Sequence, residues 1–233
     1  MILVRRVYIR LSVSMSGSDR ESTAKTGTRS AVGLFVRPKA TIQAPRTPNG
    51  GMSDASHDDE LETATLGGGC FWCVEAVLKE LDGVRSVTSG YAGGHVEDPS
   101  YEAVCRGETG HAEVVQVAFA PETIAFRDLL EVFFTIHTPT TLNREGPDVG
   151  SQYRSAVYYH NDEQRRVVES VIGELEPLYD DDIVTEVEPL ETFYPAEEYH
   201  QDYFDKNPSD TYCTVNVNPK LSKLREKHAE LLA

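Results

Sequence analysis

The sequence has no long hydrophobic run and few basic residues relative to its many acidic ones. No stretch approaches the roughly 20 apolar residues that a membrane-spanning helix needs, and arginines at positions 5, 6 and 10 interrupt the only candidate for a secretory signal. The chain has 22 Lys and Arg against 38 Asp and Glu, so its formal net charge is −16. Because nucleic acids bind basic surfaces, we expect a protein that contacts neither nucleic acid nor membrane.

Cysteine is also scarce, with four residues at positions 70, 73, 105 and 213. Without a signal peptide, so few cysteines do not indicate a structural disulfide framework, and catalytic or redox use is favoured. A zinc-binding module is an alternative, but zinc sites usually combine two close pairs of ligands. Only Cys70 and Cys73 form such a pair, and we therefore expect no metal site.

Charge divides the chain into two parts. Residues 1–51 contain nine basic and two acidic residues, a net charge of +7, which leaves 13 basic and 36 acidic residues and a net charge of −23 for residues 52–233. The first part is rich in Ser, Thr, Gly, Arg and Pro, and we expect it to be disordered. It is either an organelle transit peptide or, as we prefer, the result of a start codon assigned upstream of Met52. Residues 52–60 are then an acidic lead-in. Such an acidic surface suits high salt, which screens the repulsion between acids, so we expect the cytoplasm of a salt-loving microbe. We also expect a monomer.

Hydrophobic periodicity predicts one domain of alternating strands and helices over residues 61–233. The predicted strands are residues 61–66, 84–91, 111–120, 153–160 and 183–189. The predicted helices are residues 71–81, 124–137, 163–178, 195–205 and 221–232. Residues 138–151 are expected to form a long loop. This order predicts an α+β fold, a two-layer sandwich of a mixed sheet with helices packed on it and a ferredoxin-like split βαβ core.

The motif GGGCFWC at residues 67–73 places a thiol between a predicted strand and a predicted helix. The first N–H groups of a helix have no internal partners, and together with the helix dipole they favour a thiolate over a thiol. The glycines permit a sharp turn, and the two aromatic residues form an apolar wall for a small substrate. Cys70 is therefore the candidate nucleophile. With Cys73 it also forms the C-x-x-C pattern of redox proteins.

Several polar residues could act with this thiol. Glu113, at the start of a predicted strand, is either an exposed carboxylate or, if buried beside the thiol, a proton donor, because burial disfavours its charged form. His111 is a candidate base. Tyr101 and Tyr153 could donate hydrogen bonds to a polarised oxygen, and Asp148 lies in a turn sequence.

Four segments resemble motifs of the A-type peptide-methionine sulfoxide reductases. They are GCFW at 69–72, TGHAE at 109–113, GSQYRS at 150–155 and PAEEYHQDY at 195–203. The similarity runs in family order from Thr63 to Cys213, and residues 1–60 lie outside it. It implies reduction of the S epimer of methionine sulfoxide, free or in proteins, as repair of oxidative damage.

The resemblance also implies residue roles. Cys70 is the nucleophile, and Phe71 and Trp72 form the pocket for the substrate methyl group. Glu113, Tyr101 and Tyr153 bind and polarise the sulfoxide oxygen, and Asp148 supports the site.

The expected reaction leaves Cys70 as a sulfenic acid while Glu113 protonates the departing oxygen. A second thiol condenses with the sulfenic acid, and thioredoxin or a similar dithiol reduces the resulting disulfide, without metal or organic cofactor. Cys213 is the favoured resolving thiol, delivered by a mobile C-terminal loop, with Cys73 resolving or relaying. Cys105 is expected to be buried and inert.

A second enzymatic interpretation stays open at this point. A general dithiol–disulfide oxidoreductase would use Cys70 and Cys73 and would not need Glu113.

Overall fold

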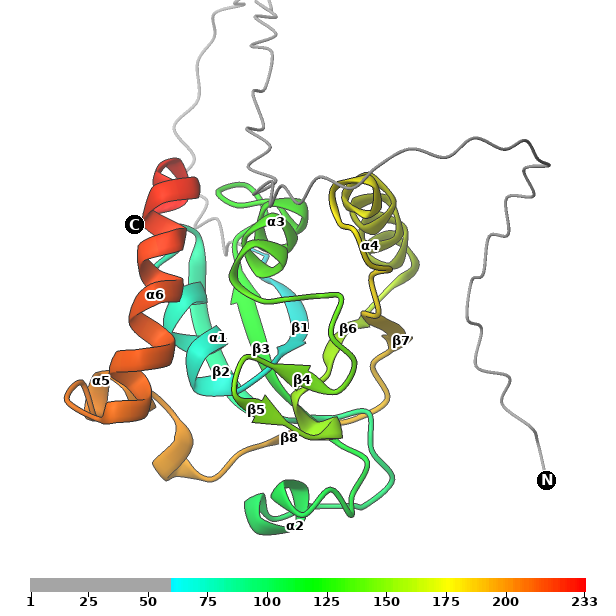
Figure 1. Ribbon diagram of the computed structural model, residues 1–233. Coiled ribbons are helices and arrows are strands. Elements are labelled where there is room, and N and C mark those ends of the chain that lie inside the picture. Colours follow the sequence, from blue (N-terminus) through cyan, green and yellow to red (C-terminus); the bar gives the residue numbers. More distant parts are fainter. Residues whose placement is uncertain (1–59) are drawn as a thin grey trace, which may run out of the picture. The chain divides into compact units, whose positions relative to one another are not determined.

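The computed structural model describes residues 60–233, so the predictions for residues 1–51, and those for 52–60 apart from Glu60, lie outside the described residues. Six strands form one sheet in the order β7-β6-β1-β3-β2-β8 (Figure 1). Their bounds are β1 Glu62–Gly68, β2 Val84–Ala92, β3 Ala112–Phe119, β6 Ser155–Tyr159, β7 Glu186–Pro189 and β8 Phe193–Pro195. Neighbouring strands are antiparallel except β6 and β7, which are parallel, and the predicted mixed sheet is confirmed.

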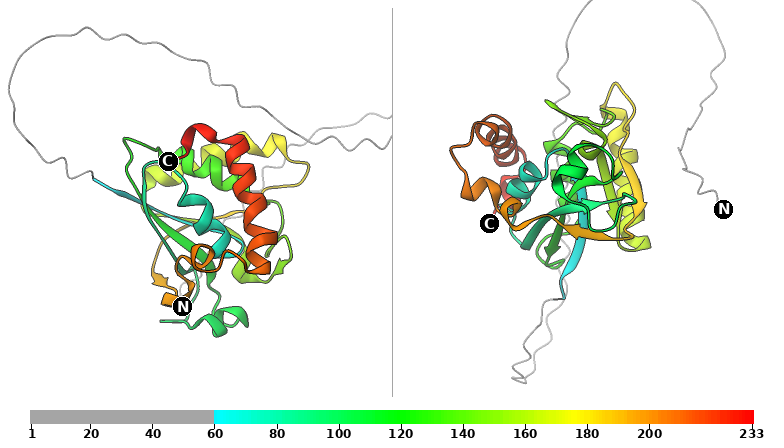
Figure 2. Two further views of the ribbon diagram at one scale, coloured as in Figure 1. Left: turned by 90° about the vertical axis from the view of Figure 1, so that its left-hand side faces the viewer. Right: turned by 90° about the horizontal axis from the view of Figure 1, so that it is seen from below.

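Four longer helices gather on one side of this sheet (Figure 2). They are α1 Phe71–Leu78, α3 Phe126–Ile136, α4 Asp162–Leu175 and α6 Thr211–Lys227. Helices α1 and α3 contact the central strands. Helix α6 packs on α1 and α3, and α4 packs on α3 and β6. The predicted α+β architecture, with helices packed on a sheet, is therefore confirmed.

Strand β3 is buried on both faces, as its sequence predicts. Val115, Val117 and Phe119 belong to the main core between sheet and helices. Val114 belongs to a second, smaller cluster on the opposite face, against which Phe193 packs. Because side chains alternate along a strand, the odd-numbered positions of β3 face α1, and Glu113 is one of them.

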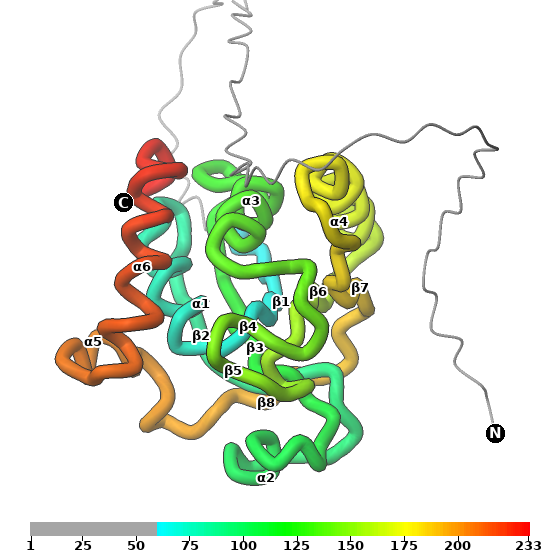
Figure 3. The backbone as a smooth tube through the Cα atoms, viewed as in Figure 1, coloured from blue at the N-terminus to red at the C-terminus, as the bar shows by residue number. Residues whose placement is uncertain are grey.

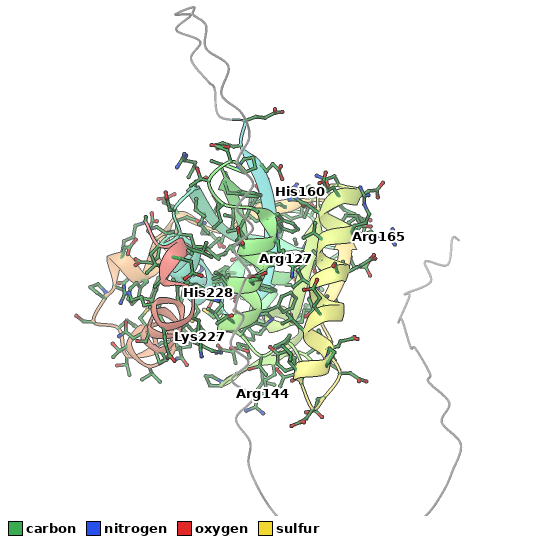
Figure 4. All side chains as sticks on the ribbon, turned by 90° about the horizontal axis from the view of Figure 1, so that it is seen from above. Arg127, Arg144, His160, Arg165, Lys227 and His228 are labelled. Carbon is green, nitrogen blue, oxygen red and sulfur yellow. The ribbon has the colours of Figure 1, made fainter. Side chains whose placement is uncertain are left out.

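Capping residues and ion pairs stabilise the helical layer. Asn161 caps α4, since its side chain accepts a hydrogen bond from the backbone N–H of Gln164, as predicted. Arg127 of α3, labelled in Figure 4, forms ion pairs with Glu174 of α4 and with Glu131 of its own helix. Within residues 60–233, no helix combines the length and apolar character needed to cross a membrane.

The prediction of one helix over residues 195–205 is wrong. The segment leaves β8 at Pro195, makes a single 3₁₀ turn over Glu198–His200, and only then forms the short helix α5, Tyr203–Lys206 (Figure 3). The break falls at Asp202, whose φ of +55° is left-handed and incompatible with a continuous helix. We call residues 195–202 the strap.

Three segments outside the predicted strands and helices contain regular structure. Residues 101–105 form α2 (Tyr101–Cys105), because the Ser100 side chain caps its first turn. The expected long loop contains a small hairpin of β4, Arg144–Glu145, and β5, Asp148–Val149. The expected C-terminal loop around Cys213 is instead the first turn of α6, which begins early because Asp210 accepts two backbone hydrogen bonds there.

Candidate active site

Cys70 lies where β1 meets α1, as the glycine-rich motif predicts. Strand β1 continues through Gly68, where a Cβ atom would lie 2.8 Å from the Phe133 ring, so this position has no room for a side chain. The turn itself is made by Gly69 alone, whose φ of +91° is left-handed. Cys70 is then the N-cap residue of α1, and its side chain is 7% exposed.

Glu113 of β3 is buried beside this turn. It is 1% exposed, and its Oε2 accepts a hydrogen bond from the backbone N–H of Phe71 at 3.1 Å. Burial raises the pKa of Glu113 to about 8, with nearby Asp148 and Cys73 adding to the effect and the Phe71 N–H opposing it. Of the two interpretations of Glu113, the structure places it as a buried acid that is mostly protonated at neutral pH.

The Cys70 side chain accepts no hydrogen bond from the N–H groups at the start of α1, on which the predicted activation depends. The N–H of Phe71 is bound by Glu113, and the N–H of Cys73 donates to the Cys70 carbonyl oxygen at 3.1 Å. Burial raises the pKa of Cys70 well above its ordinary value, and its hydrogen bond to Cys73 raises it further. The pKa of Cys73 is lowered because its sulfur accepts that bond. Cys70 and Cys73 therefore form one hydrogen-bonded pair of thiols.

Tyr212 is a site residue that the sequence interpretation missed. Its hydroxyl donates to Asp148 Oδ2 at 2.6 Å and hydrogen-bonds to Cys70. The two sulfurs, the β4–β5 hairpin and α6 line a cavity of about 50 Å³, enough for one or two water molecules. The available signal was the position of Tyr212 directly before a predicted redox cysteine.

Aromatic side chains form the other side of the site. Phe71 is buried, with ring centroids 5.9 Å from Tyr91 and 6.4 Å from Tyr101. Trp72 stacks on Tyr203 at 3.8 Å. Five of the residues given a role by resemblance thus come from α1, α2, β3, β5 and the 3₁₀ turn after it, and Glu113 interacts with each of the other four. They are Phe71, Tyr101, Glu113, Asp148 and Tyr153.

Burial raises the pKa of Tyr153, and the charges of Glu113, Cys105 and Cys70 raise it further, so its phenol faces the same site. Burial likewise raises the pKa of Tyr101, whose hydroxyl also hydrogen-bonds to Cys105. Both hydroxyls stay protonated and can donate hydrogen bonds.

Two candidates occupy places that the sequence did not predict. His111 is buried with both nitrogens used, since Nδ1 accepts from the Gly94 N–H at 3.0 Å and Nε2 lies 2.8 Å from the Val96 carbonyl oxygen. It anchors a loop and is not available as a base. Cys105 is exposed, so the prediction of a buried thiol is wrong.

Cys213 is buried in the first turn of α6. Burial raises its pKa to about 11, with contributions from Asp210 and from Cys73. The two candidates for the resolving thiol differ in their placement relative to Cys70. Cys73 is hydrogen-bonded to Cys70, whereas Cys213 is enclosed in a helix. Among residues 60–233, no three His, Cys, Asp or Glu side chains are grouped so that they could hold a metal ion.

A paired thiol at a helix start, a buried neutral acid and an aromatic wall define a thiol-dependent oxidoreductase. The family model for peptide methionine sulfoxide reductase matches residues 62–232. The chain belongs to the peptide methionine sulfoxide reductase family.

Individual relatives agree with this assignment. Peptide methionine sulfoxide reductase MsrA of Natronomonas pharaonis is 66% identical over 170 residues, covering 72% of this chain and 96% of the relative. The enzyme of that name from Halobacterium salinarum is 63% identical over 168 residues, covering 71% and 95%. Among solved structures, reduced Mxr1 of Saccharomyces cerevisiae matches with a TM-score of 0.64 and 40% identity, covering 67% of this chain and 91% of that one.

Proposed function

We propose that this protein reduces the S epimer of methionine sulfoxide, free or within proteins, with Cys70 as nucleophile and Glu113 as proton donor. The observation that carries the proposal is the buried Glu113 carboxyl, bound to the amide that follows Cys70 in the chain. A sulfoxide oxygen leaves only when it is protonated, and an acid with a pKa of about 8 holds its proton at neutral pH.

The first step balances as follows. The thiol pair ionises, Cys73 keeps the remaining proton, and the Cys70 sulfur attacks the sulfoxide. The S–O bond of the sulfoxide breaks as its oxygen passes to Cys70 and takes the proton of Glu113. The products are methionine, a Cys70 sulfenic acid and the Glu113 carboxylate. The methionine sulfur gains two electrons and Cys70 loses them. The single negative charge moves from the thiol pair to Glu113.

Substrate contacts follow from the aromatic wall. Phe71 and Trp72 hold the methyl group, and the Tyr101 and Tyr153 hydroxyls donate to the sulfoxide oxygen. The Tyr212 hydroxyl is hydrogen-bonded to Cys70, so Tyr212 withdraws from the sulfur when substrate enters. In the absence of substrate, Asp148 accepts a hydrogen bond from the Tyr212 hydroxyl.

Regeneration begins at Cys73. Its hydrogen bond to Cys70 supports a first disulfide between these two, which forms as the Cys73 thiol displaces water from the sulfenic acid. Cys213 then exchanges with this disulfide once the first turn of α6 opens. A thioredoxin-like dithiol, itself oxidised to a disulfide, returns the thiols to the reduced state. This chemistry requires a reducing compartment such as the cytoplasm, and a monomer suffices for it.

The test is turnover of resolved S and R epimers of N-acetyl-methionine sulfoxide with dithiothreitol. We expect turnover of the S epimer alone, none with Cys70→Ser, and a loss of about 100- to 10,000-fold with Glu113→Gln. Unchanged sulfoxide turnover in Glu113→Gln would refute the proton-donor role. If Glu113→Gln still reduced protein disulfides at the wild-type rate, the interpretation as a general dithiol–disulfide oxidoreductase would be favoured.

The order of the resolving thiols is tested separately by trapping sulfenic acid with dimedone after a single turnover. We expect Cys73→Ser to accumulate the Cys70 adduct and Cys213→Ser to give a Cys70–Cys73 disulfide without adduct. The opposite pattern would make Cys213 the first resolving thiol.

We also infer a ferredoxin-like core from the connections. Strands β1 and β2 are joined through α1 with β3 between them, and β6 pairs with the other edge of β1, giving the order β6-β1-β3-β2.

A further inference from the structure

Lys220 is a largely buried cation beside the two thiols, and the reaction described above does not use it. It lies on α6, and its side chain is 15% exposed. It lines the cavity of about 50 Å³ that Cys70 and Cys73 also line. Because a cavity of this size holds one or two water molecules, little space separates the wall formed by Lys220 from the sulfurs.

Two acceptors fix the ammonium group of Lys220. Its Nζ atom donates to Glu145 Oε1 at 2.6 Å and to the backbone carbonyl oxygen of Ile136 at 2.5 Å. Glu145 is held in turn, because its Oε2 accepts a hydrogen bond from the backbone N–H of Thr138 at 2.8 Å. An ammonium group has three N–H donors, so one remains for the cavity. The charge of Lys220 is therefore fixed at the cavity wall.

The charges around Cys73 come from every element packed against it. The titratable groups that act on Cys73 or line the cavity with it are Cys70 at the start of its helix, Glu113 on β3, Glu145 and Asp148 on the β4–β5 hairpin, and Tyr212, Cys213 and Lys220 on α6. Of these groups, Lys220 alone is positive. The hydrogen bond from Cys70 lowers the pKa of Cys73 most, and among the charges Lys220 lowers it further whereas Asp148 raises it.

A positive charge matters most in the resolving step. In the proposed mechanism, Glu113 becomes a carboxylate when Cys70 becomes a sulfenic acid. A thiolate on Cys73 is then a second negative charge in a buried site. Burial raises the pKa of Glu113 and the charge of Cys73 raises it further, so these two groups oppose each other's ionisation. A nearby cation lowers the energy of the doubly charged state.

We propose that Lys220 is a positioning residue for the resolving step, whose ammonium charge holds Cys73 as the thiolate that attacks the Cys70 sulfenic acid. An electron pair of the Cys73 sulfur forms the S–S bond while the S–O bond of the sulfenic acid breaks. The hydroxyl group leaves with the electron pair of that bond and takes up the proton that Cys73 lost, so one water molecule is released. The cavity beside both sulfurs has room for it. The inference rests on the proposed function and assigns a residue to its second half.

The test separates the charge of Lys220 from its ion pair. The double variant Lys220→Met, Glu145→Gln removes both charges and leaves no unpaired buried ion. Glu145→Gln alone breaks the same ion pair but keeps the cation, and it is the matched control. Both are made in a Cys213→Ser background, where Cys73 is the thiol that resolves the sulfenic acid.

The measurement is a single turnover of the S epimer of N-acetyl-methionine sulfoxide by reduced protein freed of dithiothreitol. Release of N-acetyl-methionine gives the rate of the first step, and loss of dimedone-reactive sulfenic acid gives the rate of disulfide formation. The readout is the ratio of the second rate to the first.

In the double variant we expect this ratio to fall about three- to tenfold relative to the background. A rise of about one unit in the pKa of Cys73 lowers its thiolate fraction about tenfold, and the greater nucleophilicity of the more basic thiolate offsets part of that loss. The deficit should shrink as pH rises, because Cys73 then ionises without the cation. In Glu145→Gln we expect the ratio to rise, because the ammonium loses its counter-charge.

An unchanged ratio in the double variant would overturn the proposal, and so would a deficit that does not depend on pH. The control decides even if the double variant does not fold. A ratio that falls or stays constant in Glu145→Gln would show that the ion pair only holds the hairpin to α6, and would also overturn the proposal. The proposed function fails instead if the unmodified protein releases no methionine from the S sulfoxide.

Discussion

The buried carboxyl of Glu113 predicts an unusual pH dependence of stability. Its pKa rises from 4.5 to about 8 on folding, a difference of about 3.5 units. Each unit is equivalent to about 1.36 kcal/mol, so ionisation of this one group costs the folded state up to about 5 kcal/mol. Below pH 4.5 the carboxyl is protonated in both states and costs nothing. Between pH 4.5 and 8 the unfolded chain loses this proton first, and the free energy of unfolding falls as pH rises.

Glu113→Gln removes the ionisation while keeping the shape of the side chain. We expect the free energy of unfolding of the variant, minus that of the wild type, to increase from pH 4.5 to pH 8 by several kcal/mol. The assay is urea unfolding of both proteins at half-unit pH steps under reducing conditions. Other titrating groups largely cancel in the difference because both proteins contain them. Parallel curves across this range would refute a protonated, buried Glu113.

Three further outcomes follow from the same geometry. The kcat/KM for the S sulfoxide should fall as pH rises through about 8, where Glu113 loses its proton, as a pH–rate profile would show. Gly68→Ala should lower the free energy of unfolding by about 1–3 kcal/mol, whereas Gly173→Ala, whose new Cβ meets nothing within 4 Å, should not lower it. Lys220→Met should lower it by about 2–4 kcal/mol in chemical unfolding, because Glu145, which lies 2.6 Å from Lys220 and is itself largely buried, would lose its cation.

The position of Cys70 could be predicted from sequence because its signal is local. A strand, three glycines and a helical segment follow one another directly in the chain, and the turn at Gly69 needs a residue that tolerates positive φ. Burial of Glu113 could not be predicted in this way. It depends on the pairing of β3 with β1 and β2, which brings position 113 under the first turn of α1.

Residues contributed by the C-terminal third were the hardest to predict. Tyr212 reaches the site because α6 packs on α1, and the His200 ring packs on Phe71 because the strap is bound to Ser89 and Tyr101. Neither contact leaves a periodic pattern in the sequence. The early start of α6 did leave a signal, since Asp210 is a strong N-cap residue, but the preceding Asn207 and Pro208 favoured a loop.

The electrostatics of the site explain how a thiolate and a neutral acid can coexist in one buried space. A charge on Glu113 raises the pKa of Cys70, and a charge on Cys73 raises the pKa of Glu113. The site therefore accommodates one negative charge more easily than two. When the thiol pair ionises, it makes Glu113 hold its proton more tightly, so formation of the nucleophile preserves the acid. In the proposed mechanism, turnover moves this one charge from sulfur to carboxylate. The burial that raises the pKa of Cys70 also raises that of Glu113, so the same burial that opposes the thiolate keeps the acid protonated for the proposed reaction.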